Sequence, residues 1–297
     1  MLKTIAILTP TYNRIHTLPR LFQSLMDQSS YDFKWYIVDD GSTDGTDEKY
    51  KDFFNDNFEV IFIKKLNGGK HTALNVGINA IAEELTIIVD SDDYLETHAV
   101  ETILEDWRTY CDKADIAGLC YYKMFDNGNI VGQRFPSGTE IDSYINLRVN
   151  KDVRGDKAEI FKTEVLRKYP FPVFEGEKFL SEAIVWSAIS KAGYKLAFID
   201  KGIYYCEYLT DGISAAGRKH QLKNPRGTME HAKAFMHQSV KFQLRMKYML
   251  LYSASRILAK VSIRAAWREL DGYRLLYIFW LLPGALLAVY WKKKYNL

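Results

Sequence analysis

The sequence has 297 residues, of which 47% are hydrophobic and 14% aromatic, so it can bury a large core. This composition excludes a disordered chain, a collagen-like repeat and a small disulfide-stapled scaffold. Lysine and arginine number 40 against 37 aspartates and glutamates, a net charge of +3 that is too balanced to indicate a nucleic-acid partner.

The first half of the sequence alternates short apolar runs with amphipathic helical patterns. Ile5 to Leu8 is an apolar run closed by Thr9-Pro10, and apolar residues then recur at helical spacing from Leu18 to Met26. The cycle continues, with strands expected at 35–38, 60–63, 85–89 and 116–122 and helices at about 46–54, 70–82 and 100–107. Such alternation predicts an α/β fold, a Rossmann-like, mostly parallel sheet with helices on both faces.

Polar residues gather directly after three of the expected strands. The three segments are Thr9–Arg14, Asp39–Ser42 and Asp90–Asp93. In open α/β sheets, ligands bind beyond the carboxyl ends of the strands. We therefore expect these segments to meet at one ligand, although they lie far apart in the sequence.

The chemistry of these segments indicates a nucleoside diphosphate with a divalent cation. Their carboxylates include Asp39, Asp90, Asp92 and Asp93. So much negative charge suits an anionic ligand only if Mg²⁺ or Mn²⁺ lies between them. Lys70 follows Gly68-Gly69 at the start of an expected helix, where its charge and free backbone N–H groups suit phosphates. The ring of Tyr12 can stack on a base, and the Asp39 carboxylate can accept a hydrogen bond from a base or a ribose.

Four motifs occur together in the order and spacing of a known family. They are Thr-Pro-Thr-Tyr-Asn-Arg (9–14), Val-Asp-Asp-Gly-Ser-Thr-Asp-Gly-Thr (38–46), Asn-Gly-Gly-Lys-His-Thr-Ala-Leu-Asn (67–75) and Asp-Ser-Asp-Asp (90–93). With them the sequence resembles the family 2 glycosyltransferases of the GT-A fold over roughly residues 3–215. The resemblance implies an inverting transferase that uses a sugar nucleotide, with a UDP-sugar as the expected donor, and Mn²⁺ or Mg²⁺.

The resemblance also implies roles for individual residues. Those expected at the sugar nucleotide are Thr9, Pro10, Tyr12, Arg14, Asp39, Gly69, Lys70, Asn75, Asp90, Ser91 and Asp92. Pro10, Tyr12 and Asp39 would hold the base. Asp90 would lie near the ribose, and Asp92 would bind the metal.

The catalytic base of the family is a carboxylate that follows a Gly-Glu or Gly-Asp segment. The corresponding stretch here contains Glu175, Glu177 and Glu182. Glu182 is the expected base because it precedes an apolar helix, from Ala183 to Ile189, that would hold it rigidly. Inversion by a single displacement needs such a carboxylate to take the proton of the acceptor hydroxyl.

Other positions depart from the family pattern or are less specific. Many relatives carry a metal-binding His after the last core strand, where this sequence has Asp211, a possible oxygen ligand. Asp156 and Lys157 would either face the acceptor or form a turn. The Gln-x-x-Arg-Trp signature of processive synthases is absent, so we expect one hexosyl group per encounter, transferred to a saccharide or lipid-linked hydroxyl in surface polysaccharide synthesis.

The basic charge is concentrated near the end of the sequence. Residues 241–294 hold eleven lysines and arginines against Glu269 and Asp271, a local +9 that leaves −6 for the rest. Leu275 to Trp291 is membrane-like but only 17 residues long, and Pro283-Gly284 should interrupt it. We expect a catalytic domain at 1–220, with nucleotide-binding (1–95) and acceptor-binding (96–220) parts. A helical region at 221–297 would then either attach to an anionic membrane surface or pack on that domain.

The expected location is the cytoplasm, at the inner face of the cell membrane. Three cysteines form no CxxC pair, which indicates a reducing compartment, and the first residues lack the pattern of a cleavable signal peptide.

Three other functions fit the sequence poorly. A dehydrogenase would need G-x-G-x-x-G after the first strand, and a sugar-nucleotide pyrophosphorylase a glycine-rich basic loop there. A signalling receiver would carry its acidic pair after the first strand rather than at Asp39-Asp40. A catalytically degenerate protein that only binds sugar nucleotides stays open, and turnover would separate it from an enzyme.

Overall fold

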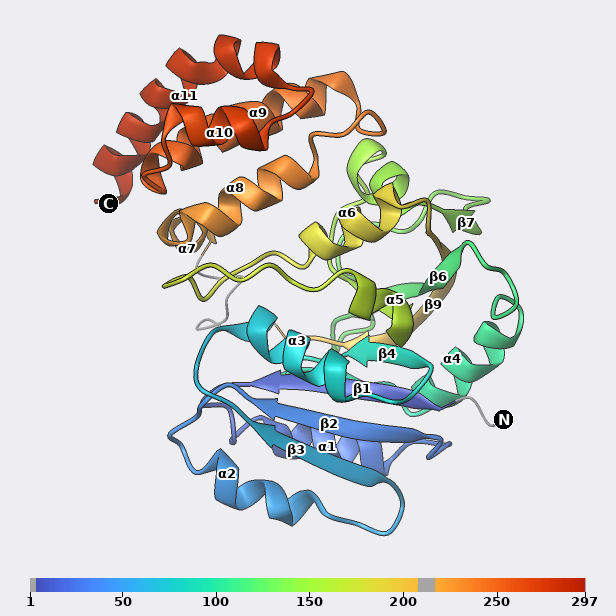
Figure 1. Ribbon diagram of the computed structural model, residues 1–297. Helices are drawn as coiled ribbons and strands as arrows, with labels where there is room; N and C mark the ends of the chain where they lie inside the picture. Colours follow the sequence, from blue (N-terminus) through green and yellow to red (C-terminus); the bar gives the residue numbers. More distant parts are fainter. Residues whose placement is uncertain (1–3, 208–216, 297) are drawn as a thin grey trace. The chain divides into compact units, whose positions relative to one another are not determined.

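The computed structural model describes residues 4–207 and 217–296 (Figure 1). The chain divides into two compact units. The first consists of Met1–Pro170 and Ala192–Glu207, and the second of Phe171–Lys191 and Tyr208–Leu297. The chain therefore passes between the two units three times.

A nine-stranded mixed sheet forms the centre of the first unit. Its strands are β1 (Ile5–Thr11), β2 (Phe33–Asp39), β3 (Glu59–Lys64), β4 (Leu85–Ile88), β5 (Tyr94–Leu95), β6 (Ile116–Met124), β7 (Ile141–Asp142), β8 (Lys157–Lys162) and β9 (Lys195–Tyr205). They are ordered β3-β2-β1-β4-β8-β6-β9-β5, and β7 pairs with β9. The neighbours among β3, β2, β1 and β4 are parallel, as are β6 and β9, whereas β8 is antiparallel to both β4 and β6. The predicted α/β sheet is confirmed.

Helices cover both faces of this sheet, as predicted. They are α1 (Leu18–Met26), α2 (Thr46–Lys49) with the 3₁₀ turn η1 (Tyr50–Phe53), α3 (Lys70–Ala80), α4 (Ala99–Arg108), the π-helix η2 (Ile145–Asn150) and α5 (Thr163–Lys168). Phe22 of α1 stacks on Trp35 of β2 at 6.1 Å between ring centroids. On α3, Gly77 lies so close to Leu8 and Val38 that a Cβ there would be 2.3 Å from Leu8 Cδ1. Because alternate strand residues point to opposite faces, α1 and α3 lie on opposite sides of the sheet (Figure 1).

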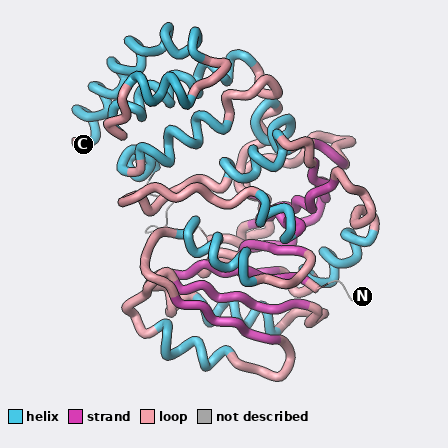
Figure 2. The backbone as a smooth tube through the Cα atoms, in the orientation of Figure 1, coloured by secondary structure: helices cyan, strands magenta, loops and turns pink. Residues whose placement is uncertain are grey.

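Within its described part, the second unit contains only helices and loops (Figure 2). The helices are α6 (Ala183–Lys191), α7 (Gly217–Lys223), α8 (Pro225–Ala234), α9 (Phe242–Leu258), α10 (Ile263–Glu269) and α11 (Arg274–Tyr295). Their core includes Met229, Met249, Tyr252 and Tyr277, each at most 2% exposed.

The predicted interruption at Pro283 does not occur, because α11 runs through it without a break. Tyr277 before the proline packs in the same cluster as Met249 and Tyr252 of α9, and Ala288 after it packs with Ala254. Contacts on both sides of Pro283 thus hold the two halves of the helix in line against α9. Tertiary packing here outweighs the local cost of one lost backbone hydrogen bond.

Candidate active site

The loops that follow β1 and β2 are joined by hydrogen bonds. Thr11 and Asp39, at the ends of these strands, are partners in the parallel register. Just beyond them, the backbone N–H of Asn13 donates to Ser42 Oγ at 2.8 Å, and Asn13 Oδ1 accepts from the N–H of Thr43 at 2.8 Å. Asn13 has a φ of 51°, a left-handed conformation that asparagine tolerates better than most residues. Two of the three predicted polar segments therefore meet at the sheet edge.

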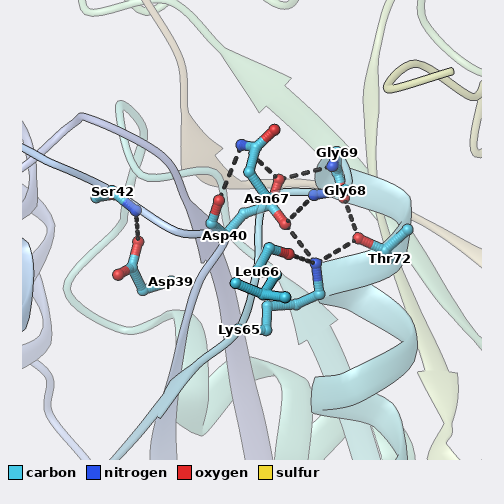
Figure 3. A network of polar contacts seen from close by, with 9 residues as sticks. All are labelled: Asp39, Asp40, Ser42, Lys65, Leu66, Asn67, Gly68, Gly69 and Thr72. Atoms are coloured by element: carbon cyan, nitrogen blue, oxygen red, sulfur yellow. Dashed lines mark hydrogen bonds and ion pairs between the residues drawn. The ribbon is translucent and has the colours of Figure 1, made fainter. Parts of the chain in front are cut away.

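Asp40 connects the β2 loop to the loop before α3 (Figure 3). Its Oδ1 accepts from Lys65 Nζ at 2.6 Å and from the N–H of Gly68 at 2.9 Å. Its Oδ2 accepts from the N–H of Gly69 at 2.7 Å and from Asn67 Nδ2 at 3.2 Å. Only 4% of this side chain is exposed, so the network fixes the backbone that leads into Lys70.

Lys70 then links α3 to the segment that follows β4. Its Nζ lies 2.5 Å from Asp90 Oδ1, and both side chains are about one third exposed, at 29% and 31%. Burial alone would raise the pKa of Asp90, but the ammonium groups of Lys70 and Lys123 outweigh it and hold that pKa below its usual value. All three predicted polar segments are thus brought to one edge of the sheet, together with the loop after β3.

At the ends of β1 and β2, two buried side-chain polar atoms lack a hydrogen-bond partner in the part of the chain that the structure describes. One is Oδ2 of Asp39, whose Oδ1 accepts from the N–H of Ser42 at 2.9 Å, and the other is Oγ1 of its register partner Thr11. A buried polar atom without a partner is costly. A ligand that donates a hydrogen bond here would remove that cost. The Asp39 side chain is fully covered, so a ligand reaches Oδ2 only after neighbouring side chains move.

The last acidic segment, Asp90–Asp93, contacts a largely buried side chain of β6 and a fully buried one of β9. The hydroxyl of Tyr204 donates to Asp93 Oδ2 at 2.6 Å and accepts from the backbone N–H of Asp90 at 3.0 Å. Lys123 Nζ lies 3.9 Å from the centroid of the Tyr204 ring and 3.6 Å from Asp93 Oδ2. Burial opposes a charge on Lys123, but Asp90 and Asp93 outweigh it and raise its pKa.

Neither Lys123 nor Tyr204 was predicted from the sequence. Tyr204 is 111 positions away from its partner Asp93, and no spacing rule connects such residues. The sequence offers one signal for Lys123, which directly follows the apolar run 116–122. A lysine that continues such a strand needs a counter-charge nearby if it is buried.

Glu177 and Glu182 have different surroundings within the second unit. Both carboxylate oxygens of Glu177 accept backbone N–H groups at the start of α8, those of Arg226 and Gly227, each at 2.7 Å. The neighbouring N–H groups of Lys178 and Phe179 donate to Asn224 Oδ1. Glu182, in contrast, is half-buried directly before α6, and its carbonyl accepts from the N–H of Val185 at 2.9 Å. Both carboxylate oxygens of Glu177 are therefore committed to capping α8.

Residues 6–169, more than half of the chain, match the family described as glycosyl transferase family 2. The chain belongs to this family. Among curated relatives, it is 33% identical over 120 residues to glycosyltransferase GlyA of Streptococcus pneumoniae and 34% identical over 134 residues to chondroitin synthase of Pasteurella multocida. These matches cover 40% and 45% of this chain but only 17% and 13% of the relatives, so the chain corresponds to a small part of each.

Solved structures share the fold across nearly the whole chain. Residues 1–349 of S. aureus TarS, in complex with UDP-GlcNAc, match with a TM-score of 0.63 and 20% identity, over 94% of this chain and 79% of that one. A mannosyltransferase from Pyrobaculum calidifontis, in complex with GDP-Man and Mn²⁺, matches with a TM-score of 0.59 and 17% identity, over 99% and 88%. The predicted GT-A fold is confirmed by these likenesses.

The residues predicted from the family motifs are not equally accessible. Tyr12 is 48% exposed at the sheet edge, and Arg14, Asn75 and Asp92 are half-buried. Pro10 is buried in β1, and Gly69 and Ser91 are buried in their loops. Thr9 lies in the interior of the sheet, where its hydroxyl accepts from Trp35 Nε1 at 2.9 Å. The Thr9 hydroxyl therefore already has a hydrogen-bond partner within this chain, the indole N–H of Trp35.

The two candidate acceptor residues also differ from each other. Asp156 is exposed, whereas Lys157 is 3% exposed and donates from Nζ to the carbonyl of Val131 at 2.8 Å. Burial lowers the pKa of Lys157 to about 8. Lys157 thus supports the 131–132 turn, and Asp156 is the member of the pair that an acceptor can reach. Asp211 lies outside the described residues.

Asp92 is half-buried and lies near a second carboxylate, that of Asp90. Burial and the nearby Asp90 raise the pKa of Asp92, and a cation beside it would relieve both effects. Among the described residues, no group of three or more His, Cys, Asp or Glu side chains is arranged to hold a metal ion. A Mg²⁺ or Mn²⁺ ion here would therefore need diphosphate oxygens and water to complete its coordination, which is the usual arrangement for Mg²⁺ at phosphate sites.

Proposed function

We propose that this protein is an inverting glycosyltransferase. It would move one hexosyl group from a nucleoside-diphosphate sugar, a UDP-sugar in the first instance, to a hydroxyl of a saccharide or lipid-linked acceptor. Membership of family 2 supports the reaction class. The polysaccharide synthases among its relatives and the UDP-GlcNAc complex of TarS support the choice of acceptor and donor classes.

The observation that carries the proposal is the joined edge of β1, β2, β3 and β4. There, Asp39 has an unpartnered buried oxygen, Lys70 is paired with Asp90, and Asp92 has a raised pKa. One end of such a site suits a group that donates hydrogen bonds, and the other suits a cation with phosphates. A nucleoside diphosphate has both kinds of group.

Individual residues would then act as follows. Asp39 accepts a hydrogen bond from the base, whose ring stacks on the exposed Tyr12. Lys70 exchanges its contact with Asp90 for a phosphate oxygen. Asp92 holds the divalent cation, which when bound supplies positive charge to the departing diphosphate. Glu182 takes the proton from the acceptor hydroxyl as that oxygen attacks the anomeric carbon.

Binding and turnover must be tested separately, because a degenerate transferase would still bind sugar nucleotides. We expect a panel of sugar nucleotides with Mn²⁺ to raise the thermal unfolding temperature, UDP-sugars most strongly, and we expect the bound donor to be hydrolysed or transferred. Asp92→Asn should remove the metal-dependent part of binding, and EDTA should do the same to the wild-type protein. Binding without any turnover, across donors and saccharide acceptors, would favour the degenerate alternative. No binding of any sugar nucleotide would refute the proposal.

We also propose that the protein works at the inner face of the cell membrane. The excess of basic residues after Lys241 supports this location, and α11 is the one helix among the described residues with the length and composition to cross a membrane.

A further inference from the structure

The exposed side of α11 is apolar along its whole middle part. Seven residues between positions 275 and 290 are exposed, and all seven are apolar or aromatic: Leu275, Ile278, Phe279, Leu282, Leu286, Val289 and Tyr290. Their exposed fractions run from 49% to 77%. At 100° per residue they fall on one continuous stripe, hereafter the outer stripe of α11. A helix on the surface of a water-soluble protein has the reverse pattern, with polar residues outward.

The opposite side of α11 is fixed to α9 by small residues. Gly284 lies so close to α9 that a Cβ on it would be 2.5 Å from Ser253 Cβ. Ala288 and Trp291 pack in one buried cluster with Ala254 and Leu222. The helix therefore cannot turn its outer stripe inward without losing this interface, and the stripe needs a partner outside the second unit's own core.

Charge selects the kind of partner. Arg274 stands at one end of the outer stripe, and Lys292, Lys293 and Lys294 stand exposed at the other. No Asp or Glu occurs anywhere in α11. At the first end, Arg274 pairs with the exposed Asp271 at 3.4 Å, so the unpaired cationic cluster is the one at the C-terminal end. If a second copy packed on the stripe with its helix parallel, the two lysine clusters would face each other, which disfavours that form of self-association. An anionic lipid surface offers apolar chains to the stripe and negative headgroups to the lysines at its C-terminal end.

The packing also determines how the helix meets the lipid. The apolar stretch Leu275–Trp291 has 17 residues, or about 25 Å of helix at 1.5 Å per residue, against about 30 Å of hydrocarbon. α9, which lies along α11, carries Arg245, Lys247 and Arg256. If α11 crossed the bilayer while packed on α9, these charges would enter the hydrocarbon.

We infer that α11 is an in-plane membrane anchor, which binds an anionic bilayer through its outer stripe while its small-residue side stays on α9. The ends of the helix lie at the headgroup level, and the C-terminal lysines stay on the same side of the membrane as the rest of the protein. This inference depends on the second unit alone. Vesicle binding therefore tests it independently of sugar-nucleotide binding or turnover.

The test uses the full chain with vesicles of phosphatidylcholine, with and without phosphatidylglycerol. The triple variant Phe279→Gln, Leu282→Gln, Leu286→Gln removes apolar surface without changing the charge, and its sites are 64–77% exposed, so folding should be kept. We expect its partition coefficient onto anionic vesicles to fall at least about 100-fold, from the transfer free energies of three large apolar side chains. The control Phe54→Gln alters an exposed aromatic residue (58%) of the first unit and should bind as the wild type does.

Two further measurements separate the alternatives. Substitution of Lys292, Lys293 and Lys294 by Gln should weaken binding in low salt and have little effect in high salt.

A maleimide that cannot cross membranes should label Asn296→Cys, in a Cys111→Ser background, on intact vesicles. Wild-type binding by the triple variant would overturn the inference, as would protection of residue 296 from the label, which indicates a crossing helix. A wild-type dimer that binds no vesicles and dissociates in the triple variant would identify the stripe as a self-association surface instead.

Discussion

Asp39 and Asp40 are adjacent in the sequence, yet replacing each with asparagine should have opposite consequences. The Asp40 carboxylate has four donors, two on each oxygen. In Asp40→Asn, one oxygen becomes an NH₂ group that faces two of these donors, and the pair with Lys65 loses its negative partner. Losing buried hydrogen bonds and breaking a largely buried ion pair should together lower the free energy of unfolding by about 3–5 kcal/mol.

Asp39→Asn should leave stability within about 1 kcal/mol of wild type, because Oδ2 has no donor to lose and Oδ1 can keep the N–H of Ser42. Nucleotide affinity should instead fall about 10- to 150-fold, the worth of one hydrogen bond to a charged group. Urea unfolding followed by circular dichroism gives the first quantity, and calorimetric titration with UDP gives the second. An unchanged urea midpoint in Asp40→Asn would refute the supporting role of the network. Unchanged UDP affinity in Asp39→Asn would refute the role of Asp39 in binding the base.

Three other predictions follow from the same contacts. Glu182→Gln should keep donor affinity and lose transfer by about 10²–10⁴-fold. Glu177→Gln should chiefly lower the free energy of unfolding, because it weakens the cap at the start of α8. The reverse pattern in a transfer assay would identify Glu177 as the base. Tyr204→Phe should cost about 1–3 kcal/mol in urea unfolding, because the hydroxyl serves both Asp93 and the Asp90 N–H, and a smaller loss would mean that water replaces it. Burial lowers the pKa of His71, so this imidazole binds a proton more readily in the unfolded chain, and the free energy of unfolding should fall as pH drops from about 7 to 5. His71→Leu should make the free energy of unfolding depend less on pH over this range. An unchanged pH dependence in that variant would show that other groups cause it.

The parts of the fold that follow local rules were predictable from the sequence. Strands β1 to β4 and helices α1, α3 and α4 come from apolar periodicity, which acts over a few neighbouring residues. The insertion of β8 between β4 and β6 was not predictable, because an antiparallel pairing such as Thr86 with Phe161 has no local sequence signature. For the same reason, the sequence places Lys157 at the acceptor or in a turn, whereas in the structure it is the buried first residue of that strand.

The candidate site divides in a similar way. Residues proposed to contact the ligand, such as Tyr12 and Lys70, follow strand ends or begin helices and were predicted from position and motif. Residues that support them, such as Lys123 and Tyr204, come from distant strands and become visible only when the sheet is assembled. Asp40 lies between these cases, since it belongs to a recognised motif but its role depends on the loop at Gly68-Gly69.

The cap that Glu177 forms on α8 affects where this chain can be divided. Four hydrogen bonds tie residues 177–179 to residues 224–227: two from the α8 N–H groups to Glu177, and two from Lys178 and Phe179 to Asn224. A chain shortened at residue 220 would retain Glu182 but lose every one of these anchors just before it. The C-terminal helices therefore belong to the framework of the candidate base, and an isolated N-terminal fragment that binds nucleotide without transferring sugar would be the natural outcome of cutting there.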